Sequence, residues 1–136
     1  MTMASNLPSL LQDLVPLVVI DVRDPGDIGK ERLLMKATSD VDLSEFIIVP
    51  ANRSGPSGIM NYNRLLFWFP KRYVYGGEYI RLYTRAGGYN VVEGRFGKEM
   101  ATFHNFYWGL PRSIWTGFAD TTAVIRISTW ISKQVI

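Results

Sequence analysis

The stretch TFHNFYWGLPRSIW, residues 102–115, decides the fold that this sequence predicts. Its first half is dense in aromatic residues and ends at a break formed by Gly109 and Pro111. A new apolar pair, Ile114 and Trp115, follows the break. Aromatic and β-branched residues favour strands, whereas Gly and Pro interrupt them. We therefore predict a strand, a tight turn and a second strand here, and not a catalytic loop.

The same signals recur along the rest of the chain. Runs rich in β-branched and aromatic residues lie between Pro, Gly and Asp turns, at residues 17–22, 32–36, 46–49, 65–69, 79–84 and 122–128. In the run 79–84, Ile80 and Leu82 occupy one face, and Ala123, Ile125 and Ile127 share the predicted inner face of the last run. Short strands between such turns favour a β-sandwich over alternating strand–helix units.

A chain of 136 residues is long enough for one domain with its own core. We predict residues 1–16 as an N-terminal extension and residues 17–136 as a single β-sandwich domain. The only helix candidate covers residues 9–14, and residues 51–64 form the longest stretch without a clear pattern. Alternation within the strands predicts a core that includes Ile20, Leu33, Phe46, Ile48, Phe67, Phe69, Ile80, Leu82, Ile125 and Ile127. Trp108 and Trp115 are predicted to be structural.

Three segments, taken in order, resemble the lamin tail domain family. They are DLSEFII at residues 42–48, FWFP with the Gly-rich YVYGGEYIRLYT at residues 67–84, and YWG through Trp115 to DTTA at residues 107–123. Glu45 and Phe46 stand where the family usually has Gly and Trp. The resemblance implies an all-β, antiparallel immunoglobulin-like β-sandwich. It also implies an interaction module, since family members make protein and nucleic-acid contacts in nuclear lamins and are appended to other proteins in bacteria.

Composition excludes several classes of protein. The chain has no cysteine, so neither a disulfide framework nor a thiolate metal site is possible. The first basic residue is Arg23, so the N-terminus lacks the basic segment of a secretory signal. No window reaches the roughly 18 apolar residues of a membrane helix. We expect no membrane partner and favour a cytoplasmic location.

No catalytic or cofactor site can be assembled from the sequence. His104 is the only histidine, it lies between Phe103 and Phe106, and there is no Gly-x-Ser-x-Gly motif. The acids nearest to it in sequence are Glu99 and Asp120. The glycines near residues 76–77, 87–88, 94 and 97 are typical of hairpin turns and do not form a phosphate-binding motif. We therefore predict no enzyme activity, no metal and no cofactor, with a structural role for His104.

An acidic cluster surrounds the turn at Asp24, with Asp21, Asp27 and Glu31 beside it. Asp is common at turns because its side chain bonds nearby backbone N–H groups. The spacing does not match an EF-hand loop, but weak calcium binding is an open alternative. Paired carboxylates for glycoside chemistry are also formally open, because sequence does not give their separation in space.

Charge is distributed unevenly, and this is the main indication of function. Residues 1–45 hold eight acids and four bases, whereas residues 46–136 hold four acids and 11 bases. Alternation places Arg81 with Tyr79 and Tyr83 on one face. Such a face suits a protein partner or self-association, and nucleic acid is the less favoured alternative. The same face would also suit packing on the second sheet or on the chain's own acidic segment. The predicted contact residues are Arg81, Tyr83, Arg85, Tyr73 and Tyr75.

Overall fold

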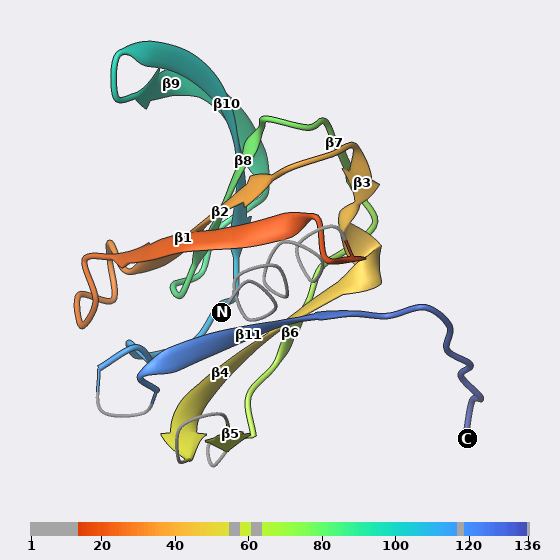
Figure 1. The fold of residues 1–136 in the computed structure, drawn as a ribbon. Coiled ribbons are helices and arrows are strands. Elements are labelled where there is room, and N and C mark those ends of the chain that lie inside the picture. Colours follow the sequence, from red (N-terminus) through yellow and green to blue (C-terminus); the bar gives the residue numbers. More distant parts are fainter. Residues whose placement is uncertain (1–13, 55–57, 61–63, 117–118, 136) are drawn as a thin grey trace, which may run out of the picture.

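The computed structural model describes residues 14–54, 58–60, 64–116 and 119–135, and these residues form an all-β sandwich (Figure 1). The first sheet has the spatial order β1-β2-β8-β10-β9, made of β1 (Leu17–Arg23), β2 (Arg32–Ala37), β8 (Tyr79–Tyr83), β10 (Glu99–Tyr107) and β9 (Asn90–Phe96). The second has the order β11-β4-β5, with β6 also paired to β4: β11 (Thr121–Arg126), β4 (Phe46–Ser54), β5 (Gly58–Met60) and β6 (Phe67–Trp68).

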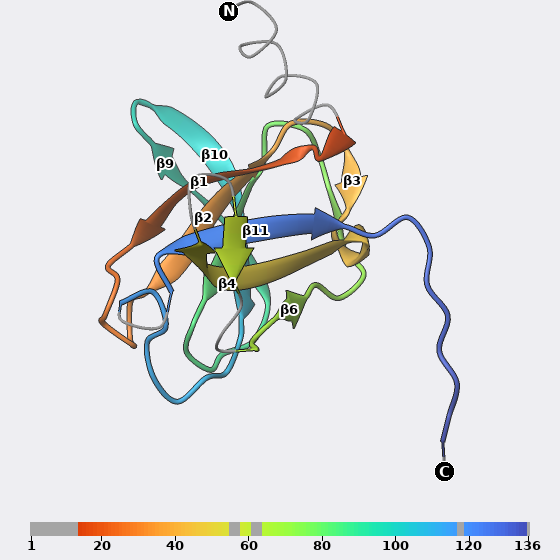
Figure 2. The ribbon, with the colours of Figure 1, turned by 60° about the horizontal axis from the view of Figure 1, so that its bottom comes forward.

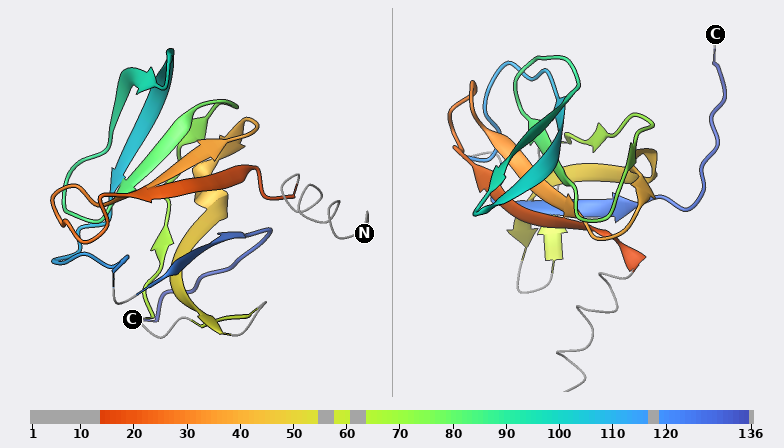
Figure 3. Two further views of the ribbon diagram at one scale, coloured as in Figure 1. Left: turned by 60° about the vertical axis from the view of Figure 1, so that its left-hand side comes forward. Right: turned by 90° about the horizontal axis from the view of Figure 1, so that it is seen from above.

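A two-stranded sheet and a short turn complete the architecture. β3 (Val41–Asp42) pairs with β7 (Tyr73–Val74), and the 3-10 turn η1 (Leu43–Glu45) leads from β3 into β4. Figure 3 shows the two larger sheets as separate layers, with the β9–β10 hairpin projecting beyond the first. All pairings are antiparallel among the described residues except one, in which β10 runs parallel to β8.

The core lies between the two larger sheets. Leu33, Ile80 and Leu82 of the first sheet are fully buried, as are Phe46 and Ile48 of the second. Phe69 is also buried, whereas Phe67 and Ile127 are half-buried. Alternation therefore predicted the core positions of β2, β4 and β8 correctly, because burial of one face imposes a period of two. Ile127 was also predicted in the core, but it follows β11 and belongs to neither core cluster of the described residues.

Two predicted core residues instead face solvent. Ile20 is 39% exposed because the pairing of β1 with β2 shifts between Val19 and Asp21, which leaves Ile20 as the extra residue of a β-bulge. Ile125 is 47% exposed, and its neighbour Val124 packs against the core instead. The reason is the register of β11, which pairs Val124 with the fully buried Ile48.

The strand predicted at Ile114 and Trp115 is wrong. β10 ends at Tyr107, the described residues 108–116 contain no strand, and β11 begins only at Thr121. The backbone amide of Ile114 donates to the Glu31 carboxylate at 2.9 Å, and that of Trp115 points to the same carboxylate at 3.4 Å. A buried side chain therefore satisfies the donors that a neighbouring strand would otherwise have paired.

Other segments differ from their predicted extent. β4 continues through Pro50 to Ser54 and pairs there with β5, so part of the predicted loop 51–64 is a hairpin. Strand β9 was not predicted from the sequence, because the glycines around it indicated turns. The predicted helix at residues 9–14 lies outside the described residues except for Leu14. After β11 the chain leaves the sandwich (Figure 2), although the Trp130 ring packs edge-on against Trp68 at 4.9 Å.

Candidate functional site

The outer face of the five-stranded sheet carries the predicted contact residues of β8. Ile80 and Leu82 belong to the core, so Tyr79, Arg81 and Tyr83 point to the opposite side of the sheet. The register of β2 places Lys36, Leu34 and Arg32 beside these three residues, and that of β10 places Phe103, Asn105 and Tyr107 on their other side. We call this surface the basic aromatic face.

Two groups of stacked rings form the floor of the basic aromatic face. The Tyr79 ring lies 4.5 Å from that of Phe96 and 5.3 Å from that of Phe103. The Tyr83 and Tyr107 rings are nearly parallel, with centroids 5.1 Å apart. Tyr79 and Phe103 are only 8% and 5% exposed, because Leu34 and Phe96 pack around them in a small second cluster. The rings therefore serve mainly as a platform.

Cations lie over these rings. The Arg81 guanidinium is 4.2 Å from the centre of the Phe103 ring, and Lys36 Nζ is 5.5 Å from that of Tyr79. The Arg85 guanidinium lies 5.1 Å from the Tyr83 ring and 5.0 Å from the Tyr107 ring. Each such contact contributes about 0.5–2 kcal/mol and holds the cation in place.

The two central arginines are held by neutral acceptors. Arg81 Nε donates to Asn105 Oδ1 at 2.7 Å, and Asn105 is itself anchored by a 2.8 Å bond to Asn90. Arg85 Nε donates to the carbonyl of Gly29 at 3.0 Å. Among the described residues, no ion pair includes Arg81 or Arg85. Their positive charges are therefore fixed in position without a carboxylate to neutralise them.

A glycine next to this face has a packing role. A Cβ atom at Gly87 would overlap the Tyr107 ring, so only glycine allows the ring to lie across the backbone there. The sequence predicted Gly87 as a turn residue, and the structure adds this close approach of an aromatic ring.

Tyr73 and Tyr75 lie apart from the basic aromatic face. Tyr73 belongs to β7, Tyr75 follows it, and their side chains are 67% and 66% exposed. Lys71 Nζ lies 6.0 Å from the Tyr73 ring. Among the described residues, the hydrogen bond and the cation–π contact of Arg81 go to Asn105 and Phe103 and not to either tyrosine, so the five predicted residues divide into two groups.

His104 has carboxylate and phenol partners that the sequence did not reveal. Its Nε2 atom lies 2.9 Å from Glu78 Oε1, and its Nδ1 atom lies 2.9 Å from the Tyr89 hydroxyl. Burial raises the pKa of that hydroxyl against the opposing charge of Arg72, and Glu78 adds to the rise. His104 is 7% exposed and both of its ring nitrogens have partners, so neither nitrogen is open to a substrate or a metal.

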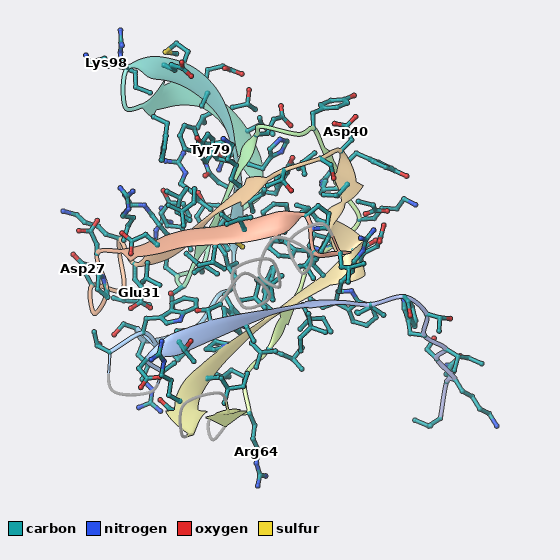
Figure 4. The ribbon with its side chains drawn as sticks, viewed as in Figure 1. Asp27, Glu31, Asp40, Arg64, Tyr79 and Lys98 are labelled. Carbon is teal, nitrogen blue, oxygen red and sulfur yellow. The ribbon has the colours of Figure 1, made fainter. Side chains whose placement is uncertain are left out.

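Glu31 is the most enclosed charged residue of the acidic cluster. It is fully buried and accepts hydrogen bonds from Thr84 Oγ1 at 2.6 Å and Gly26 N at 2.8 Å, besides the amide of Ile114. Figure 4 shows Glu31 at the base of the β1–β2 turn and Asp27 near its tip. The carboxylate oxygens thus hold loops together, which is a role that sequence position alone did not indicate.

The rest of the acidic cluster is also engaged locally. Asp24 pairs with Arg32 at 2.7 Å, and Asp27 Oδ1 accepts the Gly29 amide at 3.1 Å. Within the part of the chain that the structure describes, no three His, Asp or Glu side chains are grouped to hold a metal ion. These contacts agree with the interpretation of the acidic residues as turn residues. They give no support to calcium binding or to glycoside hydrolysis.

Over the described residues, no helix is long and apolar enough to cross a membrane.

Comparison with protein-family models and with curated proteins does not identify a relative. No protein-family model matches the sequence, and a search of curated proteins finds no significant match. The similarity to lamin tail domains therefore stays a prediction from the sequence.

Proposed function

We propose that this chain is a non-catalytic binding module that contacts an acidic segment of a partner protein, or of a second copy, with its basic aromatic face. The observation that carries the proposal is the state of Arg81 and Arg85. Both guanidiniums are fixed over aromatic rings by neutral acceptors and have no carboxylate partner among the described residues. A preorganised guanidinium is well suited to bind a carboxylate through paired hydrogen bonds.

The burial of the rings favours a protein partner over bases. Stacking of a base requires an open ring face. Tyr79 and Phe103 are nearly buried, and Arg81 already lies over the Phe103 ring. The face therefore offers charge and hydrogen-bond donors more than stacking surface. A lamin-tail-like sandwich that serves as an interaction module agrees with this proposal.

Nucleic-acid binding is the second candidate, and one observation favours it. Tyr73 and Tyr75 expose about two-thirds of their surface, so their rings are accessible for stacking, and Lys71 lies near the Tyr73 ring. The excess of bases in residues 46–136 would assist the approach of phosphates. This candidate uses Tyr73 and Tyr75, whereas the protein-binding proposal uses Arg81 and Arg85.

The double variant Arg81→Glu, Arg85→Glu tests the proposal. We expect light scattering to show a changed association state, or an acidic bait peptide to lose binding, while the fold is retained. A matched control, Arg64→Glu with Lys133→Glu, makes the same change of charge at two exposed residues outside the face. Equal behaviour of both double variants and the wild type in both assays would contradict the proposal.

A gel-shift titration separates the second candidate. Phosphate contacts release counterions, so nucleic-acid binding must weaken steeply with salt. We expect no shift at physiological salt. Tight, salt-sensitive binding that Tyr73→Ala with Tyr75→Ala abolishes would instead favour nucleic acid.

A further inference from the structure

A small cavity on the basic aromatic face is lined by four arginines. Its volume is about 140 Å³, and its walls are Arg23, Arg32, Leu34, Arg81, Arg95, Phe96 and Phe103. These residues come from β1, β2, β8, β9 and β10. Figure 4 shows that two turns lie on the same side of the molecule. They are the β1–β2 turn, marked by Asp27, and the tip of the β9–β10 hairpin, marked by Lys98. No acidic side chain lines the cavity.

Two of the four arginines are neutralised by their own neighbours. Arg32 pairs with Asp24 at 2.7 Å, and Arg23 pairs with Asp21 at 3.3 Å. Neither Arg81 nor Arg95 forms an ion pair with any described residue. The cavity therefore holds two positive charges that the described part of the chain does not balance.

Arg81 is already oriented for an anion. Its Nε atom donates to Asn105, and its guanidinium carbon lies 4.2 Å from the centre of the Phe103 ring. Its terminal NH₂ groups have no hydrogen-bond partner among the described residues. They form the part of the guanidinium that binds an oxyanion. Since the side chain is positioned in advance, little further ordering is needed on binding.

We infer that this cavity binds a phosphate dianion, of the kind carried by a phosphorylated side chain of the partner. The inference rests on the proposed function, because the cavity lies within the proposed contact face. A phosphate monoester carries a charge of about −1.5 to −2 at pH 7, which matches two unpaired guanidiniums. The cavity volume of about 140 Å³ is several times the roughly 30 Å³ that one water molecule occupies in the liquid, so the cavity has room for one phosphate group.

The same features disfavour a nucleic-acid backbone. Each of its phosphodiesters carries one negative charge, and the chain continues on both sides of every phosphate. A compact cavity bounded by the Phe96 and Phe103 rings suits a terminal group better than a continuous strand.

Calorimetric titration of the full chain tests the inference with four probes. They are inorganic phosphate, a short neutral peptide with one phosphoserine, the same peptide without phosphate, and an oligothymidylate without terminal phosphate. We expect the first two to bind and the last two to fail. Binding should weaken several-fold between pH 7.5 and 5.5, because the second pKa of the phosphate is about 6.

Variants identify the cavity as the site. Arg81→Gln and Arg95→Gln should each weaken phosphopeptide binding at least about tenfold, since each removes an unpaired charge. Arg23→Gln should weaken it less, because Asp21 already neutralises Arg23. Arg64→Gln is the matched control and should leave it unchanged. If Arg81→Gln does not fold, Arg81→Lys retains the charge without the planar donor pair and should still bind more weakly.

The outcomes distinguish this inference from the proposed function. Equal binding of the two peptides, or full affinity in both Arg81→Gln and Arg95→Gln, overturns the phosphate site. Displacement of the phosphopeptide by the oligothymidylate overturns it in favour of nucleic acid. If phosphate fails to bind but Arg81→Glu with Arg85→Glu still disrupts association, only the inference is lost. Phosphopeptide affinity well above that of inorganic phosphate supports a phosphorylated partner, and equal affinities support a site for free phosphate.

Discussion

Glu31 and Arg81 each carry a charge next to the five-stranded sheet, in opposite surroundings. Glu31 is fully buried, and its oxygens accept hydrogen bonds from three segments of the chain. Arg81 is half-buried and gives one hydrogen bond to a neutral amide. The bonding capacity of Glu31 is used within the fold, whereas much of that of Arg81 is left for another molecule. We therefore expect changes at Glu31 to affect stability and changes at Arg81 to affect binding.

Replacement of Glu31 by Ala should have the largest effect. It leaves the Ile114 amide and the Thr84 hydroxyl without their acceptor in a buried place, and the Gly26 amide without its acceptor in a partly buried one. We expect a loss of about 5 kcal/mol in the free energy of unfolding, measured by urea denaturation. Asp27→Ala is the control, because Asp27 is exposed and should cost under about 1 kcal/mol. A Glu31→Ala protein as stable as the wild type would remove the basis of the comparison.

Replacement of Trp115 by Ala tests the apolar packing next to Glu31, because the Trp115 amide points to the Glu31 carboxylate. The side chain is 8% exposed, contacts the Trp108 ring, and donates from Nε1 to Thr122. We expect a loss of about 3–5 kcal/mol in the free energy of unfolding. Trp108→Ala should cost less, because Trp108 is only half-buried. An unchanged melting temperature for Trp115→Ala would contradict a structural role.

Replacement of His104 by Ala should have an intermediate effect. Glu78 and Tyr89 would each lose a partner, which we expect to cost about 2 kcal/mol in stability. Association through the basic aromatic face should persist in the folded variant. Loss of that association without a change in melting behaviour would show that His104 takes part in function.

Replacement of Arg81 by Gln should change stability little. It removes one hydrogen bond and one contact with the Phe103 ring, so we expect about 1 kcal/mol or less. The same variant should lose most of its phosphopeptide binding. A thermal melt beside the titration gives both values, and a large fall in melting temperature would place Arg81 with Glu31 as a structural residue.

Asp42 is intermediate between Glu31 and Arg81, and its contribution to stability can be measured from the dependence of stability on pH. Burial raises the pKa of this carboxyl, but hydrogen bonds from Ser44 N and Oγ and the charge of Lys71 together hold the pKa below its usual range. Its contribution is therefore present above the unfolded pKa of about 3.9 and is lost as the pH falls through the folded value. We expect Asp42→Asn to be slightly less stable at pH 7, and its stability to fall less in acid. Identical acid unfolding curves would contradict this assignment.

Alternation along β8 predicted the shared face of Arg81 and Tyr83 because the period of a strand is a local property. The orientation of Ile125 was not predictable in this way, since the register with Ile48 sets which side faces the core. The partners of His104 were also hidden, because Glu78 lies 26 residues away and approaches it through tertiary packing. The arginines of the cavity come from separate strands, so no sequence motif marks them.

The reach of Glu31 along the chain has a consequence for synthesis on the ribosome. Its donors Thr84 and Ile114 lie 53 and 83 residues downstream, so they emerge long after the β1–β2 hairpin has been made. Until then the carboxylate is best satisfied by water, and the hairpin lacks the strands that bury its inner face. Contacts between such distant residues form slowly, because a long loop must close first. A nascent chain halted before Ile114 should therefore be sensitive to proteases along β1 and β2, and acquire protection only after this residue has left the exit tunnel.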